Sequence, residues 1–146
     1  MTKTPKTPWV KAMDFLARRD HSELELREKL QRHFSLEEID TVILEVKERG
    51  WILPPQELSD KVNEQLHRKN KGYLYICHFL RKRGLPEVAR NPDIELEKAL
   101  SLIESKHSEF LNKPNKLASL LKNRGFDTET IGKVIHEIRR NSSSLY

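Results

Sequence analysis

Apolar residues recur along this chain with the spacing of amphipathic helices. Residues four positions apart share one face of an α-helix. Three such apolar pairs follow one another along the chain: Leu26 and Leu30, Ile76 and Leu80, and Leu117 and Leu121. No segment alternates between apolar and polar residues for long enough to predict a strand. The pattern predicts an all-α chain of about nine helices, arranged as three tandem three-helix repeats.

Start and stop signals bound these helices. Serine followed three residues later by glutamate is a capping box, and it occurs at Ser22 and again at Ser35. Gly84 and Gly125 each follow an apolar pair by four residues, where a helix commonly ends on a left-handed residue. The helix that begins after Ser35 is expected to turn one apolar stripe inward, made of Leu36, Ile39, Val42, Ile43 and Val46.

Prolines and changes in composition divide the chain. Residues 1–8 hold three threonines, two lysines and two prolines, and we expect a disordered basic leader there. Leu53-Pro54-Pro55 forms a rigid joint, because each proline fixes its own φ and restricts the residue before it. We expect helical repeats over residues 9–52, 53–91 and 92–140, followed by a C-terminal tail over residues 141–146.

The second repeat is expected to be the least regular. Pro86 can occupy the first position of a helix, but Asn91-Pro92 follows almost at once. The third helix of this repeat is therefore predicted to be truncated to one or two turns. In the third repeat, Asp93 and Asp127 are expected to cap helices with their side chains.

Charge is distributed unevenly and favours an anionic partner. The chain carries a net charge of +5, with an isoelectric point of about 9.3. Residues 68–90 hold seven basic residues and one acidic residue, whereas residues 20–50 hold nine acidic and five basic residues. The basic clusters form either a solvated face or a binding surface. As a hypothesis, the residues that contact a filament or DNA are Arg18, Arg19, Arg27, Lys69, Lys71, Arg81, Lys82, Arg83, Lys122 and Arg124.

The sequence offers little for catalysis. The six histidines are scattered, without His-Glu-x-x-His or Cys/His zinc spacing, and there is no Gly-rich phosphate loop or Gly-x-Ser-x-Gly elbow. Cys77, the single cysteine, is interpreted as a small core residue in a cytoplasmic protein. No apolar run approaches the length of a membrane span. We expect no catalytic residue, metal, cofactor or membrane partner.

Three stretches, taken together, resemble the repeat signatures of the RecX family of recombinase regulators. They are residues 16–30, residues 72–85 with Leu80-Arg81-Lys82-Arg83-Gly84-Leu85, and residues 117–131 with Lys122-Asn123-Arg124-Gly125-Phe126. The resemblance extends over residues 9–140. It implies three tandem three-helix repeats in an elongated, curved array. It also implies a non-enzymatic regulator that binds the RecA recombinase–DNA filament and modulates, by inhibition, its recombination, ATPase and co-protease activities.

Two alternatives remain open at this stage. One is a direct DNA-binding protein that uses basic three-helix units in helix-turn-helix fashion, and the other is a helical adaptor without a nucleic-acid role. The partners expected from the resemblance are the RecA filament together with single- or double-stranded DNA, and the protein is expected to act as a monomer.

Overall fold

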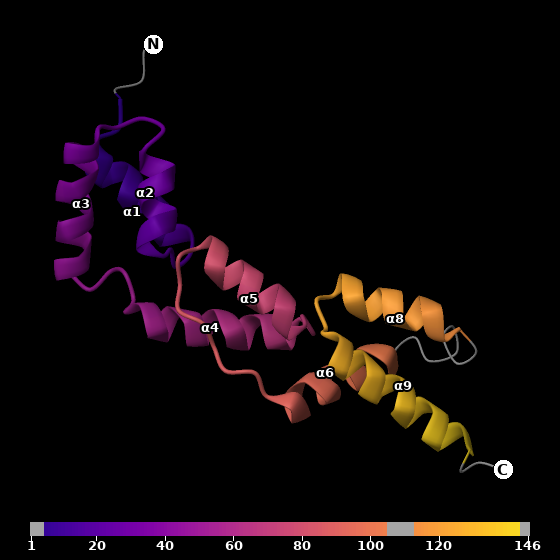
Figure 1. Ribbon diagram of the computed structural model, residues 1–146. Coiled ribbons are helices and arrows are strands. Elements are labelled where there is room, and N and C mark those ends of the chain that lie inside the picture. The colour runs from indigo at the N-terminus through magenta and orange to yellow at the C-terminus, as the bar shows by residue number, and fades with distance from the viewer. Residues whose placement is uncertain (1–4, 105–112, 144–146) are drawn as a thin grey trace. The chain divides into compact units, whose positions relative to one another are not determined.

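A computed structural model describes residues 5–104 and 113–143, and this part of the chain contains eight α-helices and no strand (Figure 1). The predicted all-α fold is confirmed. The helices are α1 (Pro8–Arg18), α2 (Glu23–Leu30), α3 (Leu36–Glu48), α4 (Pro55–Arg68), α5 (Tyr73–Lys82), α6 (Pro92–Glu104), α8 (Pro114–Asn123) and α9 (Thr128–Ser143).

The chain packs as two compact units. Unit 1 comprises Met1–Ser59 with Arg81–Pro86, and unit 2 comprises Asp60–Leu80 with Glu87–Tyr146. Helices α4 and α5 therefore contribute residues to both units. This division into two units does not test the boundaries of the three repeats expected from the sequence, which stay a prediction.

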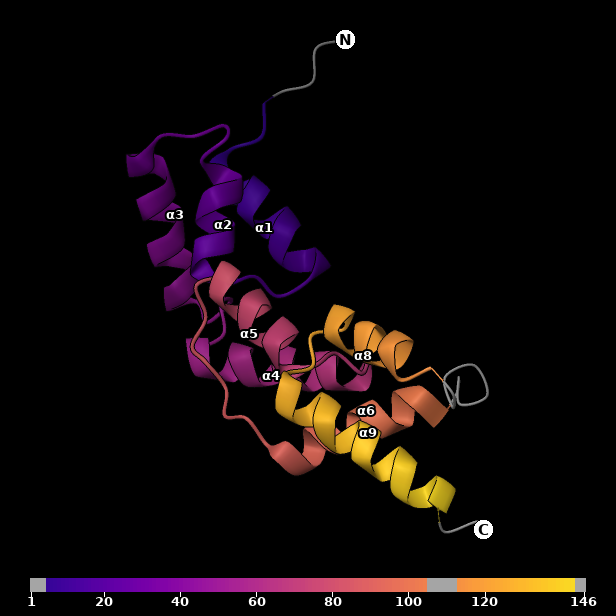
Figure 2. The same cartoon turned by 45° about the vertical axis from the view of Figure 1, so that its right-hand side comes forward.

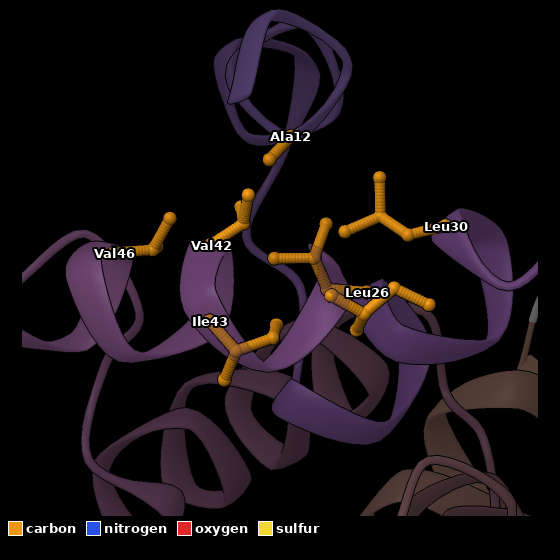
Figure 3. Close-up of a cluster of buried hydrophobic side chains, with 7 residues drawn as sticks. Ala12, Leu26, Leu30, Val42, Ile43 and Val46 are labelled. Atoms are coloured by element: carbon orange, nitrogen blue, oxygen red, sulfur yellow. The ribbon is translucent and has the colours of Figure 1, made fainter. Parts of the chain in front are cut away.

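Unit 1 is built around the contacts of α1, α2 and α3, whose buried side chains converge between the three helices (Figure 3). Leu26 and Leu30 of α2 are at most 1% exposed, as predicted. Each fully buried leucine contributes about 1.5–3 kcal/mol through the hydrophobic effect. The α3 stripe is confirmed except for Leu36, which is 69% exposed. Leu36 is the first residue of α3 and lies at the edge of the apolar stripe, so no neighbouring helix covers it.

The predicted capping boxes fix the starts of α2 and α3. Ser22 Oγ accepts a hydrogen bond from the N–H of Glu25, and the Glu25 carboxylate accepts one from the N–H of Ser22. Ser35 and Glu38 repeat this arrangement. At the first helix, Thr7 Oγ1 accepts from the N–H of Val10, so α1 begins at Pro8 inside the segment expected to be a leader.

Helices α6, α8 and α9 of unit 2 lie together (Figure 2). They pack on a second apolar core that includes Phe126. Leu117 and Leu121 of α8, together with Ile76 and Leu80 of α5, are at most 2% exposed, which confirms the predicted burial of these pairs. Asp127 accepts from the N–H of Thr130 and caps α9, as expected. Helix α9 continues to Ser143, into the predicted tail, while residues 1–4 and 144–146 lie outside the described residues.

The short helix predicted after Gly84 is wrong, since residues 85–91 have no helical structure. Backbone carbonyls that a helix would use are bound by side chains instead. Ser59 Oγ donates to the carbonyl of Pro86 at 2.8 Å in unit 1, and the Tyr73 hydroxyl donates to that of Val88 at 3.0 Å in unit 2. Leu85 and Val88 are both buried, so packing further stabilises the extended path.

The expected cap of α6 is also corrected. Asn91 Oδ1, rather than Asp93, accepts from the backbone N–H groups of Asp93 and Ile94. Helix α6 consequently begins at Pro92, which occupies the first helical position, where its missing N–H has no cost.

Candidate functional site

The ten basic residues proposed from the sequence belong to both units, and each group is considered separately. Unit 1 holds Arg18, Arg19, Arg27, Arg81, Lys82 and Arg83, and unit 2 holds Lys69, Lys71, Lys122 and Arg124. Their value for binding a polyanion depends on whether a neighbouring carboxylate already neutralises them.

Glu25 forms ion pairs with two of the unit 1 arginines. Its Oε2 atom lies 2.7 Å from Arg19 Nη2 and 3.3 Å from Arg83 Nε. Burial alone would raise the pKa of Glu25, but the hydrogen bonds from Arg19 and from the Ser22 backbone outweigh it, and the pKa is lowered. Ser22 Oγ also donates to the carbonyl of Arg83 at 2.7 Å. The capping box of α2 therefore anchors the segment that follows α5.

The remaining unit 1 cations differ in availability. Arg27 is held by Asp40 at 2.6 Å and by Glu23 at 3.6 Å. In contrast, no ion pair engages Arg81 or Lys82 among the residues that the structure describes, and both are exposed in the last turn of α5. Arg81 and Lys82, like Arg18 at the end of α1, are therefore exposed cations of unit 1 that could meet an anionic partner.

In unit 2, the start of α5 docks on the turn between α8 and α9. The N–H of Gly72 donates to the carbonyl of Arg124 at 2.8 Å, and the N–H of Leu74 donates to that of Gly125 at 2.9 Å. Free N–H groups at a helix start carry partial positive charge, and carbonyls at the end of another helix carry partial negative charge. The docking therefore satisfies both helix ends, and it is encoded by residues far apart in the sequence.

This docking creates a small basic and aromatic surface. Lys71 Nζ lies 4.7 Å from the centroid of the Tyr75 ring, which is a cation–π distance. Tyr75 is 37% exposed and stacks on Phe79, with ring centroids 6.2 Å apart. Because the Gly72 N–H binds the carbonyl of Arg124, the candidate residues Lys71 and Arg124 are brought onto adjacent backbone segments. Lys69 and Lys122, which precede Lys71 and Arg124 by two residues in the sequence, are also exposed.

Gly125 makes the close approach possible. Its φ is +88°, and a Cβ atom there would lie 2.4 Å from Tyr75 Cβ and 2.6 Å from Tyr75 N. Gly50, which ends α3 with φ +71°, has nothing within 4 Å of the equivalent position. The two glycines thus share a left-handed backbone and differ in the space around it.

We expect Gly125→Ala to destabilise the protein well beyond Gly50→Ala. Gly50→Ala carries only the left-handed penalty of about 1–2 kcal/mol, whereas Gly125→Ala also forces α5 away from the turn. Urea unfolding of both variants measures the difference. Equal losses would mean that the turn and the start of α5 separate without cost.

Residues 9–45 match the family model described as RecX, first three-helix domain. The regulatory protein RecX of Neisseria gonorrhoeae is 32% identical over 142 residues, which span 88% of this chain and 89% of that protein. The chain belongs to the RecX family. The regulatory protein RecX of Prosthecochloris aestuarii is 28% identical over 140 residues, covering 90% of this chain and 93% of the relative.

RecX crystal structures share the fold of this chain. The structure of RecX from Lactobacillus salivarius matches with a TM-score of 0.71 at 21% identity, covering 90% of this chain and 94% of that one. The resemblance inferred from the repeat signatures is thereby confirmed. The match of residues 9–45 covers α1, α2 and most of α3, where three of the candidate arginines lie: Arg18, Arg19 and Arg27.

The RecX relatives are named regulatory proteins. Within residues 5–104 and 113–143 of this family member, no group of three or more His, Cys, Asp and Glu side chains is arranged to hold a metal ion. No helix in the same ranges has the length and apolar character needed to cross a membrane. Cys77, interpreted from the sequence as a core residue, is only half-buried on α5.

Unit 2 of this RecX-family chain contains a buried polar network that was not predicted from the sequence. Glu95 and Lys98 of α6 are 1% and 6% exposed, and Lys98 Nζ lies 2.5 Å from Glu95 Oε2. The ammonium also donates to His67 Nδ1 at 2.7 Å and to the carbonyl of Lys71 at 2.9 Å, so its three donors are used. Glu95 Oε1 accepts from the N–H of Tyr73 at 2.7 Å.

This network supports the Lys71–Tyr75 surface from beneath. Burial lowers the pKa of Lys98, and the hydrogen bond and charge of Glu95 oppose that shift. Burial and the nearby Lys98 charge lower the pKa of His67, which favours the neutral imidazole that accepts a hydrogen bond from Lys98. A Glu and Lys three residues apart are typical of an exposed helix face, so the burial of this pair could not be predicted from the sequence.

Proposed function

We propose that this RecX-family protein is a cytoplasmic, monomeric and non-catalytic regulator that binds the RecA recombinase–DNA filament. It inhibits the filament's recombination, ATPase and co-protease activities by occupying its surface. The observation that carries this proposal is family membership across nearly the whole length of the chain, with 88% of it aligned to a regulatory protein RecX.

The charge pattern supports a filament as the partner. A recombinase filament contains DNA and is therefore a polyanion, and local positive potential steers proteins onto polyanions. Arg81 and Lys82 at the end of α5 provide exposed cations without an internal ion pair in the described ranges. Lys71 beside Tyr75 adds a cation over an aromatic face. These groups are the proposed electrostatic contacts.

Direct DNA binding is the second candidate, because a three-helix first domain is compatible with helix-turn-helix docking. The outward face of α3 argues against that use. Glu37, Asp40 and Glu48 are exposed along this helix, and carboxylates there would meet phosphates if α3 entered a groove. Any DNA contact is therefore assigned to the basic residues rather than to α3.

The double substitution Arg81→Glu with Lys82→Glu tests the electrostatic contacts. Titration onto preformed filaments should show binding weakened by about tenfold or more, and a salt dependence reduced by a log–log slope of about 2, since two ionic contacts are lost. Thermal unfolding should change little, because neither side chain forms an ion pair in the described part of the chain.

The control variant is Lys133→Glu with Arg140→Glu on α9, which changes the net charge equally. Both lysine and arginine pair there with neighbouring glutamates of the same helix, and neither belongs to the candidate set. If the two double variants bind filaments with equal midpoints, overall charge rather than the end of α5 determines binding.

A further inference from the structure

Unit 1 contains an apolar pocket whose lining includes Arg27 but neither Arg81 nor Lys82. The pocket has a volume of about 420 Å³, and its apolar lining comes from α2, the Ile52–Pro55 joint, the start of α4 and the segment after α5. Leu24 lies at this pocket and is 40% exposed. A Cβ atom built on Gly84 would lie 2.9 Å from Leu24 Cδ2, so the leucine side chain rests against the glycine backbone.

Charged side chains link the pocket to α3. Arg27 and Lys47 line the pocket, and Glu23 lies between them, 2.7 Å from Lys47 Nζ and 3.6 Å from Arg27 Nη2. Arg27 also binds Asp40 of α3 at 2.6 Å. Leu44, one turn after Asp40 on the same side of the helix, is 60% exposed. Leu24 and Leu36 of unit 1 are also exposed large hydrophobic residues.

The charges around this surface select the partner. Both cations at the pocket are already bound to carboxylates. Farther along α3, Glu37 and Glu48 are exposed, and no ion pair engages either of them in the ranges that the structure describes. The α3 part of this surface is therefore apolar and locally negative in a chain of net charge +5, whereas the exposed cations Arg81 and Lys82 precede Gly84 on the α5 side of the pocket. Such a surface repels phosphates and attracts basic protein segments.

We propose that the pocket and the outer face of α3 dock a basic segment of a protein. An apolar side chain of that segment enters the pocket beside Leu24, and its lysine or arginine residues face Glu37 and Glu48. Buried apolar anchors in pockets dominate the energetics of protein interfaces, while charges at the rim select the partner. Resting on the proposed function, the inference assigns the segment to a recombinase subunit of the filament.

The test places a charge at the pocket and at the α3 face, in Leu24→Asp and Leu44→Asp. Each variant should bind preformed recombinase filaments at least about tenfold more weakly, as expected for loss of an apolar anchor. Binding to single-stranded DNA alone should be unchanged, and the melting temperature should change little in Leu44→Asp, whose parent side chain is 60% exposed. Val10→Asp is the matched control, because Val10 is also 40% exposed but lies on α1 outside the pocket. It should bind filaments like the parent.

Each other outcome has a defined meaning. If both variants bind filaments as the parent does, the docking surface is wrong and the proposed function stands. If they weaken binding to bare DNA equally, the surface contacts nucleic acid and the inference is overturned. If the parent sediments as a dimer that Leu24→Asp dissociates, the occupant is a second copy, which also overturns it. A parent that does not bind filaments overturns the proposed function and this inference with it.

Discussion

Glu95→Gln is expected to lower the free energy of unfolding by about 3–5 kcal/mol, the usual cost of removing one partner from a buried ion pair. Glutamine has nearly the same shape and can still accept from the N–H of Tyr73. It cannot neutralise Lys98, a residue that is 6% exposed and whose ammonium loses its only carboxylate partner in the described part of the chain.

The pH dependence separates this cause from a packing defect. Burial already lowers the pKa of Lys98, and loss of Glu95 should lower it further. The folded protein then binds fewer protons than the unfolded chain below the ordinary lysine pKa of about 10.4, so the stability of the variant rises as pH increases toward that value. Unfolding in urea at several pH values measures this. The control Glu97→Gln, at an exposed position of α6, should change stability by less than about 0.5 kcal/mol.

Leu26→Ala is expected to cost about 2–5 kcal/mol, because it removes a fully buried side chain and leaves a cavity. Leu26 is 0% exposed and lies between α1, α2 and α3 in the core of unit 1 (Figure 3). The control Leu44→Ala removes the same atoms from a position that is 60% exposed. Chemical denaturation of both variants measures the contrast, and similar costs would mean that the core of unit 1 is not packed as described.

Local sequence signals predicted most of the helical framework. The serine of a capping box and the glutamate three residues later bind each other across one turn, so both boxes, at Ser22 and at Ser35, are present as predicted. Gly84 and Gly125 adopt the expected left-handed conformation, with φ values of +67° and +88°. Apolar pairs four residues apart also require only helical geometry, and all six residues are buried.

The failures occur where contacts between distant residues decide the structure. A helix after Gly84 was compatible with Pro86, but the hydroxyls of Ser59 and Tyr73 bind carbonyls of that segment and favour an extended path. Leu36 fitted the apolar stripe of α3 but is not covered by another helix. Counting charges along the sequence could not show that, among the described residues, Arg83 forms an ion pair and Arg81 does not. The partner of Arg83 is Glu25, which lies 58 positions earlier in the sequence.

The basic residues of the candidate site could be predicted from the sequence, but their arrangement in space could not. The sequence identifies Lys71 and Arg124 as cations, but only the docking of α5 on the α8–α9 turn brings their backbone segments together. Glu95 and Lys98, which hold that region from beneath, resemble an ordinary exposed pair in the sequence. The assignment of these residues to filament contact stays a prediction until binding is measured.

The most direct test measures the affinity of the protein for single-stranded DNA with and without RecA recombinase and a non-hydrolysable ATP analogue. A filament regulator should bind the recombinase-coated DNA at least about tenfold more tightly than bare DNA at the same salt concentration, because protein contacts add to the phosphate contribution. The result that contradicts the account is an affinity unchanged by recombinase that falls with salt only as expected for phosphate contacts, which would assign this protein to direct DNA binding.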